Sequence, residues 1–313
     1  MRILVSGSTG FLGTALIEAL ERDHHEVAGL VRPETAQGKA GGSSKQIVSW
    51  DPVSGKFDAA AAEGADALIH LAGASIAGGR WNAARKNLLR TSRIDATRHL
   101  IGALSKLQRP PRVIVGASAI GYYGSRGDEI LTETSAPGND FLSGACREWE
   151  AETARGTEFG ARVVSLRFGI ILAAHGGALP QMMMPIKMGV GGRLGTGRQW
   201  MSWLALEEAV RIIQFALAKN ELAGPVNTVT PNPVQNAEFT RVLARALHRP
   251  ALFPAPAFAL RLALGEMADA LLLVSQKVAP AKLVSSGYNF LHAELEDVLK
   301  LALRKNPSSS AGK

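Results

Sequence analysis

The chain has 313 residues, of which 46% are hydrophobic and 20% are charged, as is ordinary for a folded globular protein. Its net charge of +8 and pI near 9.8 raise the question of nucleic-acid binding. The basic residues are dispersed and form no block or aromatic-interleaved motif, so we expect no nucleic-acid partner. The single cysteine, Cys146, excludes an internal disulfide and is typical of a reducing cytoplasm, which is the location we predict.

The length suffices for one large α/β domain or two smaller ones. We expect no secretory leader, because the first predicted strand begins at residue 2. The most apolar late segment, 258–274, contains Arg261, Glu266 and Asp269. These charges favour an amphipathic buried helix, and we predict no membrane association.

The first 32 residues carry the strongest pattern in the chain. Residues 2–6 form an apolar run predicted as a strand, and 14–22 have a helical pattern. Between them lies G-x-x-G-x-x-G, a spacing typical of a dinucleotide-binding turn, with an ordinary turn as the alternative. The residues that we expect to contact the dinucleotide there are Gly7, Ser8, Thr9, Gly10, Phe11, Leu12 and Gly13.

The second predicted strand, 26–31, ends at Arg32, about 20 residues after the glycines. NAD-binding proteins of this type place an acidic residue there for the ribose 2′-hydroxyl. A guanidinium would instead pair with a 2′-phosphate, so the sequence predicts NADP(H) as the cofactor. A surface arginine at the end of a strand is the alternative.

Strands and helices alternate up to residue 168. We predict strands at 46–49, 66–71, 112–117 and 162–168, helices at 80–107 and 140–155, and a surface loop at 33–45. With the first two strands this makes a Rossmann-like, doubly wound parallel α/β sheet of six strands. Leu71, Ala72 and Gly73 end one strand, where small residues would let a ribose approach the backbone. A plain strand-to-helix turn would look the same.

The second half differs in its residue pattern. Glycines cluster at 189–197, a strand is predicted at 225–229, and helices are predicted at 206–219, 236–247 and 294–303. We predict an NADP(H)-binding domain at 1–170 and a smaller α/β substrate lid at 171–305, of which about 200–230 packs back on the first domain. We expect residues 306–313 to be a disordered tail.

Motifs along nearly the whole chain match one family. The matching segments are 7–13, 70–73, 80–86, 118–124, 146–150, 167–169, 189–203, 231–234, 264–266 and 278–283. On these residues the chain resembles an atypical extended short-chain dehydrogenase/reductase of the nucleotide-sugar-epimerase-like family, with a C-terminal domain of unknown function. The resemblance implies a Rossmann-like fold with bound NADP(H), an undefined small-molecule substrate, and Arg80 beside the cofactor. A homodimer is left open.

The usual catalytic set of such reductases is incomplete. They use a serine with a Tyr-x-x-x-Lys pair, in which the tyrosine exchanges a proton with the substrate oxygen. Ser118 matches the serine position to within one residue, but Phe141 and Ala145, or Leu142 and Cys146, stand where the pair belongs. Phenylalanine has no acidic proton, so the usual mechanism is excluded at that location.

Three functions remain open. The first is an NADP-dependent oxidoreductase in which Tyr122 or Tyr123 supplies the acid, Ser118 polarises a carbonyl, and Lys86 or Lys187 supplies a positive charge. The second is an NADPH-binding sensor or scaffold without turnover. The third is a nucleotide-sugar epimerase or dehydratase, which the missing lysine disfavours most.

Other reactive residues have simpler explanations. Cys146 lies one helical turn from Trp149, and core packing is preferred over nucleophilic chemistry. His24 and His25 lack further ligands at metal spacing, so we expect no metal site. The chain also departs from the family after Trp203, where Ala205 replaces the usual histidine.

Overall fold

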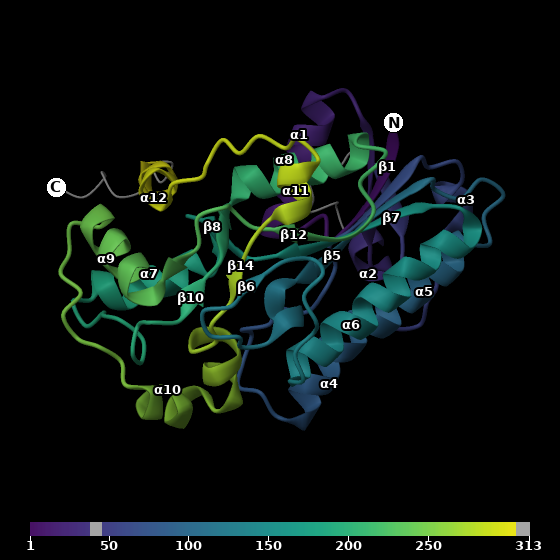
Figure 1. Cartoon of the computed structure of the whole chain (residues 1–313). Helices are drawn as coiled ribbons and strands as arrows, with labels where there is room; N and C mark the ends of the chain where they lie inside the picture. Colours follow the sequence, from purple (N-terminus) through teal and green to yellow (C-terminus); the bar gives the residue numbers. More distant parts are fainter. Residues whose placement is uncertain (38–45, 305–313) are drawn as a thin grey trace. The chain divides into compact units, whose positions relative to one another are not determined.

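The computed structural model describes residues 1–37 and 46–304 (Figure 1). The predicted tail at 306–313 lies outside the described residues. The chain divides into two compact units that are not continuous in sequence. The first unit contains Met1–Tyr122, Asn139–Arg167 and Val210–Val226, and the second contains Tyr123–Gly138, Phe168–Ala209 and the chain from Asn227 onward.

Within the described residues, seven strands form one sheet in the order β12-β7-β5-β4-β1-β2-β3. Their bounds are β1 (Arg2–Ser6), β2 (Glu26–Val31), β3 (Gln46–Ser49), β4 (Ala67–His70), β5 (Val113–Ala119), β7 (Arg162–Phe168) and β12 (Gly224–Thr228). Neighbours from β3 through β5 pair in parallel. The predicted Rossmann-like sheet is confirmed. It is one strand larger than expected, because the segment at 224–228 joins its edge.

The parallel register brings the loops of the site to one edge of the sheet. Ser6 of β1 pairs with His70 of β4, and His70 pairs with Gly116 of β5. The glycine turn, the segment after His70 and the end of β5 therefore leave the sheet at the same carboxyl edge. Ligands bind at this edge in open α/β sheets.

The helices of the first unit cover the sheet on both faces (Figure 1). They include α1 (Phe11–Arg22), α3 (Ala59–Ala62), α4 (Ala83–Thr91), α5 (Ile94–Leu104), α6 (Phe141–Ala154) and most of α8 (Leu206–Ala218). The prediction of a single helix at 80–107 is wrong, because the helix is interrupted between α4 and α5. At the break, the Ser92 hydroxyl accepts the Ala74 amide, and Arg93 donates to the carbonyl of Ala74.

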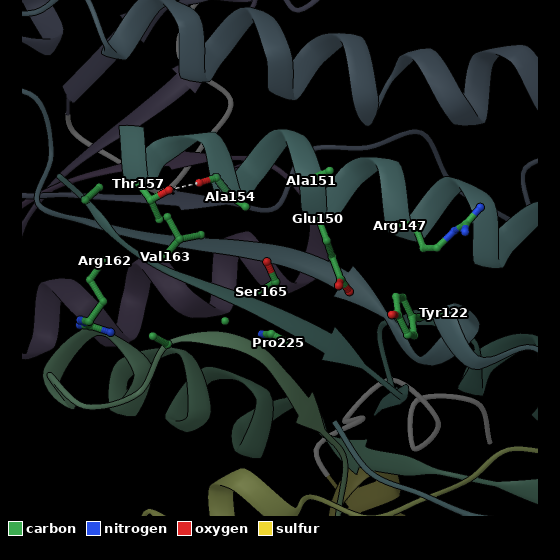
Figure 2. A pocket seen from close by; sticks show the side chains of 13 residues that line it. Tyr122, Arg147, Glu150, Ala151, Ala154, Thr157, Arg162, Val163, Ser165 and Pro225 are labelled. Carbon is green, nitrogen blue, oxygen red and sulfur yellow. Dashed lines mark hydrogen bonds between the residues drawn. The ribbon is translucent and has the colours of Figure 1, made fainter. Parts of the chain in front are cut away.

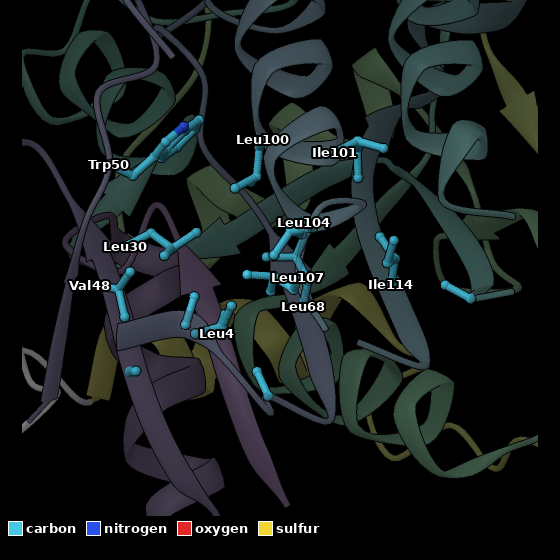
Figure 3. Packing of buried hydrophobic residues seen from close by; sticks show 14 of the residues in the cluster. Leu4, Leu30, Val48, Trp50, Leu68, Leu100, Ile101, Leu104, Leu107 and Ile114 are labelled. Carbon is cyan, nitrogen blue, oxygen red and sulfur yellow. The ribbon is translucent and has the colours of Figure 1, made fainter. Parts of the chain in front are cut away.

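One core cluster of the first unit lies between the sheet and α5 (Figure 3). Leu100, Ile101 and Leu104 of α5 pack on apolar side chains of the strands, of which Leu4 and Leu68 are fully buried. This packing follows from the sequence. Strands covered on both faces read as continuous apolar runs, while α5 buries one stripe.

The second unit has its own core and short sheets. Its strands are β6 (Ile130–Leu131), β8 (Ile170–Ala173), β9 (Gly176–Gly177), β10 (Trp200–Met201), β11 (Trp203–Ala205), β13 (Val234–Gln235) and β14 (Lys277–Val278). Its helices include α7 (Leu179–Lys187), α9 (Asn236–Ala246), α10 (Ala257–Leu264), α11 (Ala281–Ser285) and α12 (Leu295–Arg304). Trp203, Met183 and Leu299 are buried among these elements.

Two further expectations about local structure are wrong. Residues 33–37, predicted as loop, form the short helix α2 (Pro33–Gln37), which proline favours at its first position. The predicted buried helix at 258–274 is split by Gly265, whose φ of 62° ends α10. α10 has no buried residue, and its Phe258 and Leu262 side chains are 73% and 79% exposed.

No helix among residues 1–37 and 46–304 combines the length and apolar character needed to cross a membrane.

Candidate functional site

The glycine turn, residues 7–13, has backbone geometry that side chains would obstruct. Gly7 has a φ of +73°, and a Cβ there would lie 2.9 Å from the carbonyl carbon of Leu71. A Cβ on Gly13 would lie 2.1 Å from the carbonyl oxygen of Gly7. The two glycines therefore permit the tight turn and the close approach of α1 to it.

The N-terminus of α1 is suited to an anion. Its N-cap is Gly10, which gives no side-chain hydrogen bond to the first turn. The amide groups that begin a helix are donors without helical partners, and the helix dipole favours negative charge there. Thr9, Gly10 and Phe11 are exposed, whereas Ser8, Leu12 and Gly13 are buried. A pyrophosphate fits this turn.

A buried polar chain supports the turn from below. The Ser6 Oγ accepts hydrogen bonds from the amides of Leu71 and Ala72, at 3.1 and 3.2 Å. It therefore gives its own proton to His70 Nδ1 at 2.6 Å, which leaves Nε2–H to donate to Thr97 Oγ1 at 2.8 Å. Burial lowers the pKa of His70 to about 4, so this histidine is neutral at pH 7.

Arg32 lies at the end of β2, as predicted, and is exposed. It is near Asp51, whose pKa is lowered mainly by hydrogen bonds from Ser54 and Val53 and to a smaller extent by Arg32. The guanidinium is accessible to a ligand phosphate. Arg80 is also exposed, on the segment between β4 and α4.

Ser118, near the end of β5, is only 3% exposed and belongs to a charged cluster. Its hydroxyl donates to Glu150 Oε1 at 2.6 Å. Arg167 donates to both oxygens of Glu150, from Nε and Nη2 at 2.8 Å each. Glu150 thereby neutralises an arginine whose side chain is 3% exposed. The Ser118 proton is therefore engaged by a carboxylate.

The two predicted tyrosines are separated by this arrangement. The Arg167 guanidinium lies 3.4 Å from the centre of the Tyr122 ring, so it covers one face of that ring. Tyr123 is fully buried in the second unit, and its hydroxyl donates to Asn227 Oδ1 at 2.6 Å. The structure brings Tyr122 close to the Ser118 cluster and turns Tyr123 into a buried structural contact.

An open pocket of about 490 Å³ reaches the same cluster from the side of α6 (Figure 2). Glu150 and Tyr122 lie at one end of it, and Arg162 lies at the other (Figure 2). Between them the walls are mostly small side chains, such as Ala151 and Ala154 of α6. The pocket is therefore lined mainly by α6, β7 and β12, and it meets the Ser118 cluster at Glu150.

Phe141, one of the two residues predicted to stand in place of the usual tyrosine, begins α6, and Asp140 is the N-cap of this helix. The Ser143 hydroxyl ties this helix start to the carbonyl of Gly121, just after β5. Trp81 packs edge-on to the Phe141 ring, with centroids 5.5 Å apart. The ammonium of Lys86, from α4, lies 5.3 Å from the centre of the same ring.

Cys146 has no sign of nucleophilic activation. It is buried, and burial raises the pKa of its thiol to about 12, with a smaller contribution from the Glu150 charge. A thiol in this state is an inert core group.

Three contributors to the site were not singled out from the sequence. His70, Glu150 and Arg167 were seen only inside family motifs, without roles. A signal did exist for two of them, because a histidine and an arginine inside apolar strands need buried partners. Those partners, Ser6, Thr97 and Glu150, come from distant parts of the chain.

The parallel sheet, the glycine turn and the helix N-terminus above it define a Rossmann-like dinucleotide-binding protein. A model of the NAD dependent epimerase/dehydratase family matches residues 3–229, and the chain belongs to that family. Residues 255–302 match a domain of unknown function, DUF1731. The family resemblance predicted from the sequence is confirmed, including its C-terminal domain.

Relatives are similar over their full lengths. An epimerase family protein of Mycobacterium bovis is 40% identical over 300 residues, which cover 96% of this chain and 97% of the relative. The epimerase family protein YfhF of Bacillus subtilis is 39% identical over 306 residues, with 96% and 97% covered.

Solved structures show the same architecture. The crystal structure of human epimerase family protein SDR39U1, isoform 2, with NADPH has a TM-score of 0.87 and 32% identity, and 98% of this chain and 100% of that chain are covered. The UDP-glucuronic acid 4-epimerase of Bacillus cereus in complex with NAD has a TM-score of 0.76 and 17% identity, with 97% and 99% covered. The second likeness shows the fold alone.

Proposed function

We propose that this chain is an NADP(H)-dependent oxidoreductase that acts on a carbonyl or hydroxyl group of a small molecule. The glycine turn carries the proposal, because Gly7 and Gly13 leave no room for a Cβ and α1 presents its N-terminus there. The human relative crystallised with NADPH supports the choice of cofactor.

The residues of the turn, Gly7 to Gly13, would hold the pyrophosphate, and Leu71, Ala72 and Gly73 would face the ribose. Arg32 would bind the 2′-phosphate, because an exposed guanidinium at the end of β2 pairs well with a phosphate. When bound, the nicotinamide supplies or accepts a hydride. The protein would then orient the substrate and manage a proton at its reacting oxygen.

Ser118 would act mainly through Glu150. Its hydroxyl proton is donated to that carboxylate, so Ser118 can offer a substrate only an oxygen lone pair while the cluster is intact. Tyr122 keeps one ring face against Arg167 and remains a candidate acid. The burial of Tyr123 and its bond to Asn227 argue against a role in proton transfer.

The engaged hydroxyl of Ser118 and the phenylalanine at position 141 also favour a second function, an NADPH-binding sensor without turnover. Purified protein should be titrated with NADPH and NADH by fluorescence. Oxidation of NADPH should then be followed with a panel of aldehydes, ketones, quinones and nucleotide sugars.

Selective NADPH binding with carbonyl-dependent oxidation is the expected result. Tight binding without oxidation by any of these would replace the reductase by the sensor. Conversion of a nucleotide sugar without net change in the cofactor would instead identify an epimerase or dehydratase. If neither cofactor binds, the proposal is wrong.

A further inference from the structure

The Lys86 ammonium lies near the position where the family's usual tyrosine is expected and is missing. Phe141, at the start of α6, is one of the two residues predicted to stand in place of the usual tyrosine, and its ring carries no acidic proton. The Lys86 ammonium lies 5.3 Å from the centre of this ring. Trp81, which is 8% exposed, packs against this ring in a T-shaped arrangement.

The position of Lys86 is set by local structure. It is the fourth residue of α4, whose start is fixed by the Asn82 side chain accepting the Arg85 amide at 2.8 Å. The Trp81 indole donates to the carbonyl of Ile76 at 3.0 Å, which anchors the segment just before the helix. Lys86 is half-buried, and its ammonium lies over the Phe141 ring.

Of the other candidate acids on this unit, Ser118 and Cys146 do not offer a proton to a substrate, and Tyr122 remains the competing acid. The Ser118 hydroxyl donates to Glu150, and the Cys146 thiol keeps its proton because burial raises its pKa to about 12. Tyr122 lies against Arg167, on the side of the α6 pocket. Lys187, the other lysine considered from the sequence, ends α7 in the second unit.

We propose that Lys86 replaces the absent tyrosine as the group that exchanges a proton with the substrate oxygen. The proposal rests on the oxidoreductase function above. Lysine is among the side chains that serve as general acids and bases, and its ammonium also stabilises a developing oxyanion.

Reduction of a carbonyl consumes one hydride and one proton. The carbonyl carbon gains the hydride that the cofactor supplies, and the π electron pair of the C=O bond moves to oxygen. That oxygen takes a proton from the Lys86 ammonium and becomes a hydroxyl. The neutral amine is then protonated again from water, and oxidation of an alcohol runs the same steps in reverse.

The first test needs no turnover. The protein is acetylated with a small amount of acetic anhydride, with and without saturating NADPH, and each lysine is quantified by peptide mass spectrometry. Lys86 should be protected several-fold by NADPH, while Lys106, an exposed lysine of the same unit, should not change. Equal acetylation of Lys86 in both samples, at a concentration where NADPH is bound, would overturn the proposal.

The second test uses a rescue. Lys86→Gln should keep NADPH affinity and lower kcat on the order of 100-fold, the usual contribution of a general acid. Adding Phe141→Tyr restores a phenol at its usual position and should recover part of kcat, with a changed pH profile. Lys106→Gln is the matched control and should behave as wild type.

The outcomes separate this proposal from the function on which it rests. Full activity of Lys86→Gln, or a loss of activity that follows a loss of NADPH binding, rejects Lys86 as the acid and leaves the oxidoreductase standing. Activity lost in Tyr122→Phe but kept in Lys86→Gln assigns the role to Tyr122. If the wild-type protein binds NADPH but does not oxidise it with any of the substrates, both proposals are rejected.

Discussion

The glycine turn and the Ser118 cluster lie at the same sheet edge, but the first depends on backbone geometry and the second on side-chain contacts. The turn is mainly backbone, and its requirement is the absence of side chains at Gly7 and Gly13. The cluster is made of side chains from β5, α6 and β7 that satisfy one another, with Glu150 bound by Ser118 and Arg167. The turn has the usual form of a dinucleotide-binding turn, whereas the Ser118 hydroxyl at the same edge is engaged by a carboxylate.

The largest effect on cofactor affinity is expected at the turn. Gly13→Ala would place a Cβ 2.1 Å from the Gly7 carbonyl oxygen, so the turn or α1 must move. We expect NADPH affinity to fall on the order of 100-fold, or about 2.7 kcal/mol, in a fluorescence titration. Gly102→Ala is the control, because a Cβ there meets no atom within 4 Å and alanine favours a helix. Similar affinities of the two variants would contradict the close approach.

The cluster should respond in stability. Glu150→Gln removes the charge that compensates the buried Arg167, and the free energy of unfolding should fall by roughly 3 kcal/mol in urea denaturation. Glu148 lies on the same helix as Glu150 and forms an exposed pair with Arg90 of α4. Glu148→Gln, which breaks this pair, should change the free energy of unfolding by less than about 1 kcal/mol. Equal effects would show that the cluster is not held by its charge pairing.

The support beneath the turn should be sensitive to pH. The pKa of His70 is about 4 in the folded protein and 6.5 as its ordinary value, so the unfolded chain binds more protons between these values. Stability should therefore fall as the pH drops from about 6.5 to 4, by up to about 3 kcal/mol from this group. Urea midpoints of wild type and His70→Gln across this range should differ in slope. Parallel slopes would show that His70 is not the group that titrates.

Cofactor choice should give the smallest effect. Arg32→Asp should weaken NADPH by roughly ten-fold or more, because the 2′-phosphate loses a charge-assisted partner, and should leave NADH nearly unchanged. Arg22→Asp, at the exposed end of α1, makes the same change in net charge and serves as the control. An equal loss of both cofactors in Arg32→Asp would rule out a 2′-phosphate contact.

The sequence by itself determined the sheet, the glycine turn and the position of Arg32. These features depend on short runs: apolar strands such as 2–6, 26–31 and 162–168 were located to the residue, because buried parallel strands are apolar along their whole length. The absence of a phenol at Phe141 was equally readable, since it depends on the identity of one residue. The break between α4 and α5 was not, because the Ala74 contacts that end the helix come from another loop.

Only the tertiary structure decided how the remaining groups are used. Ser118 and Glu150, or Lys86 and Phe141, are far apart in the chain and meet through packing of α4, α5 and α6 on the sheet. The sequence treated Tyr122 and Tyr123 as alternatives, whereas folding stacks one against Arg167 and buries the other against Asn227. Local pattern fixes backbone conformation, but the proton that each side chain can give depends on partners that only the folded chain supplies.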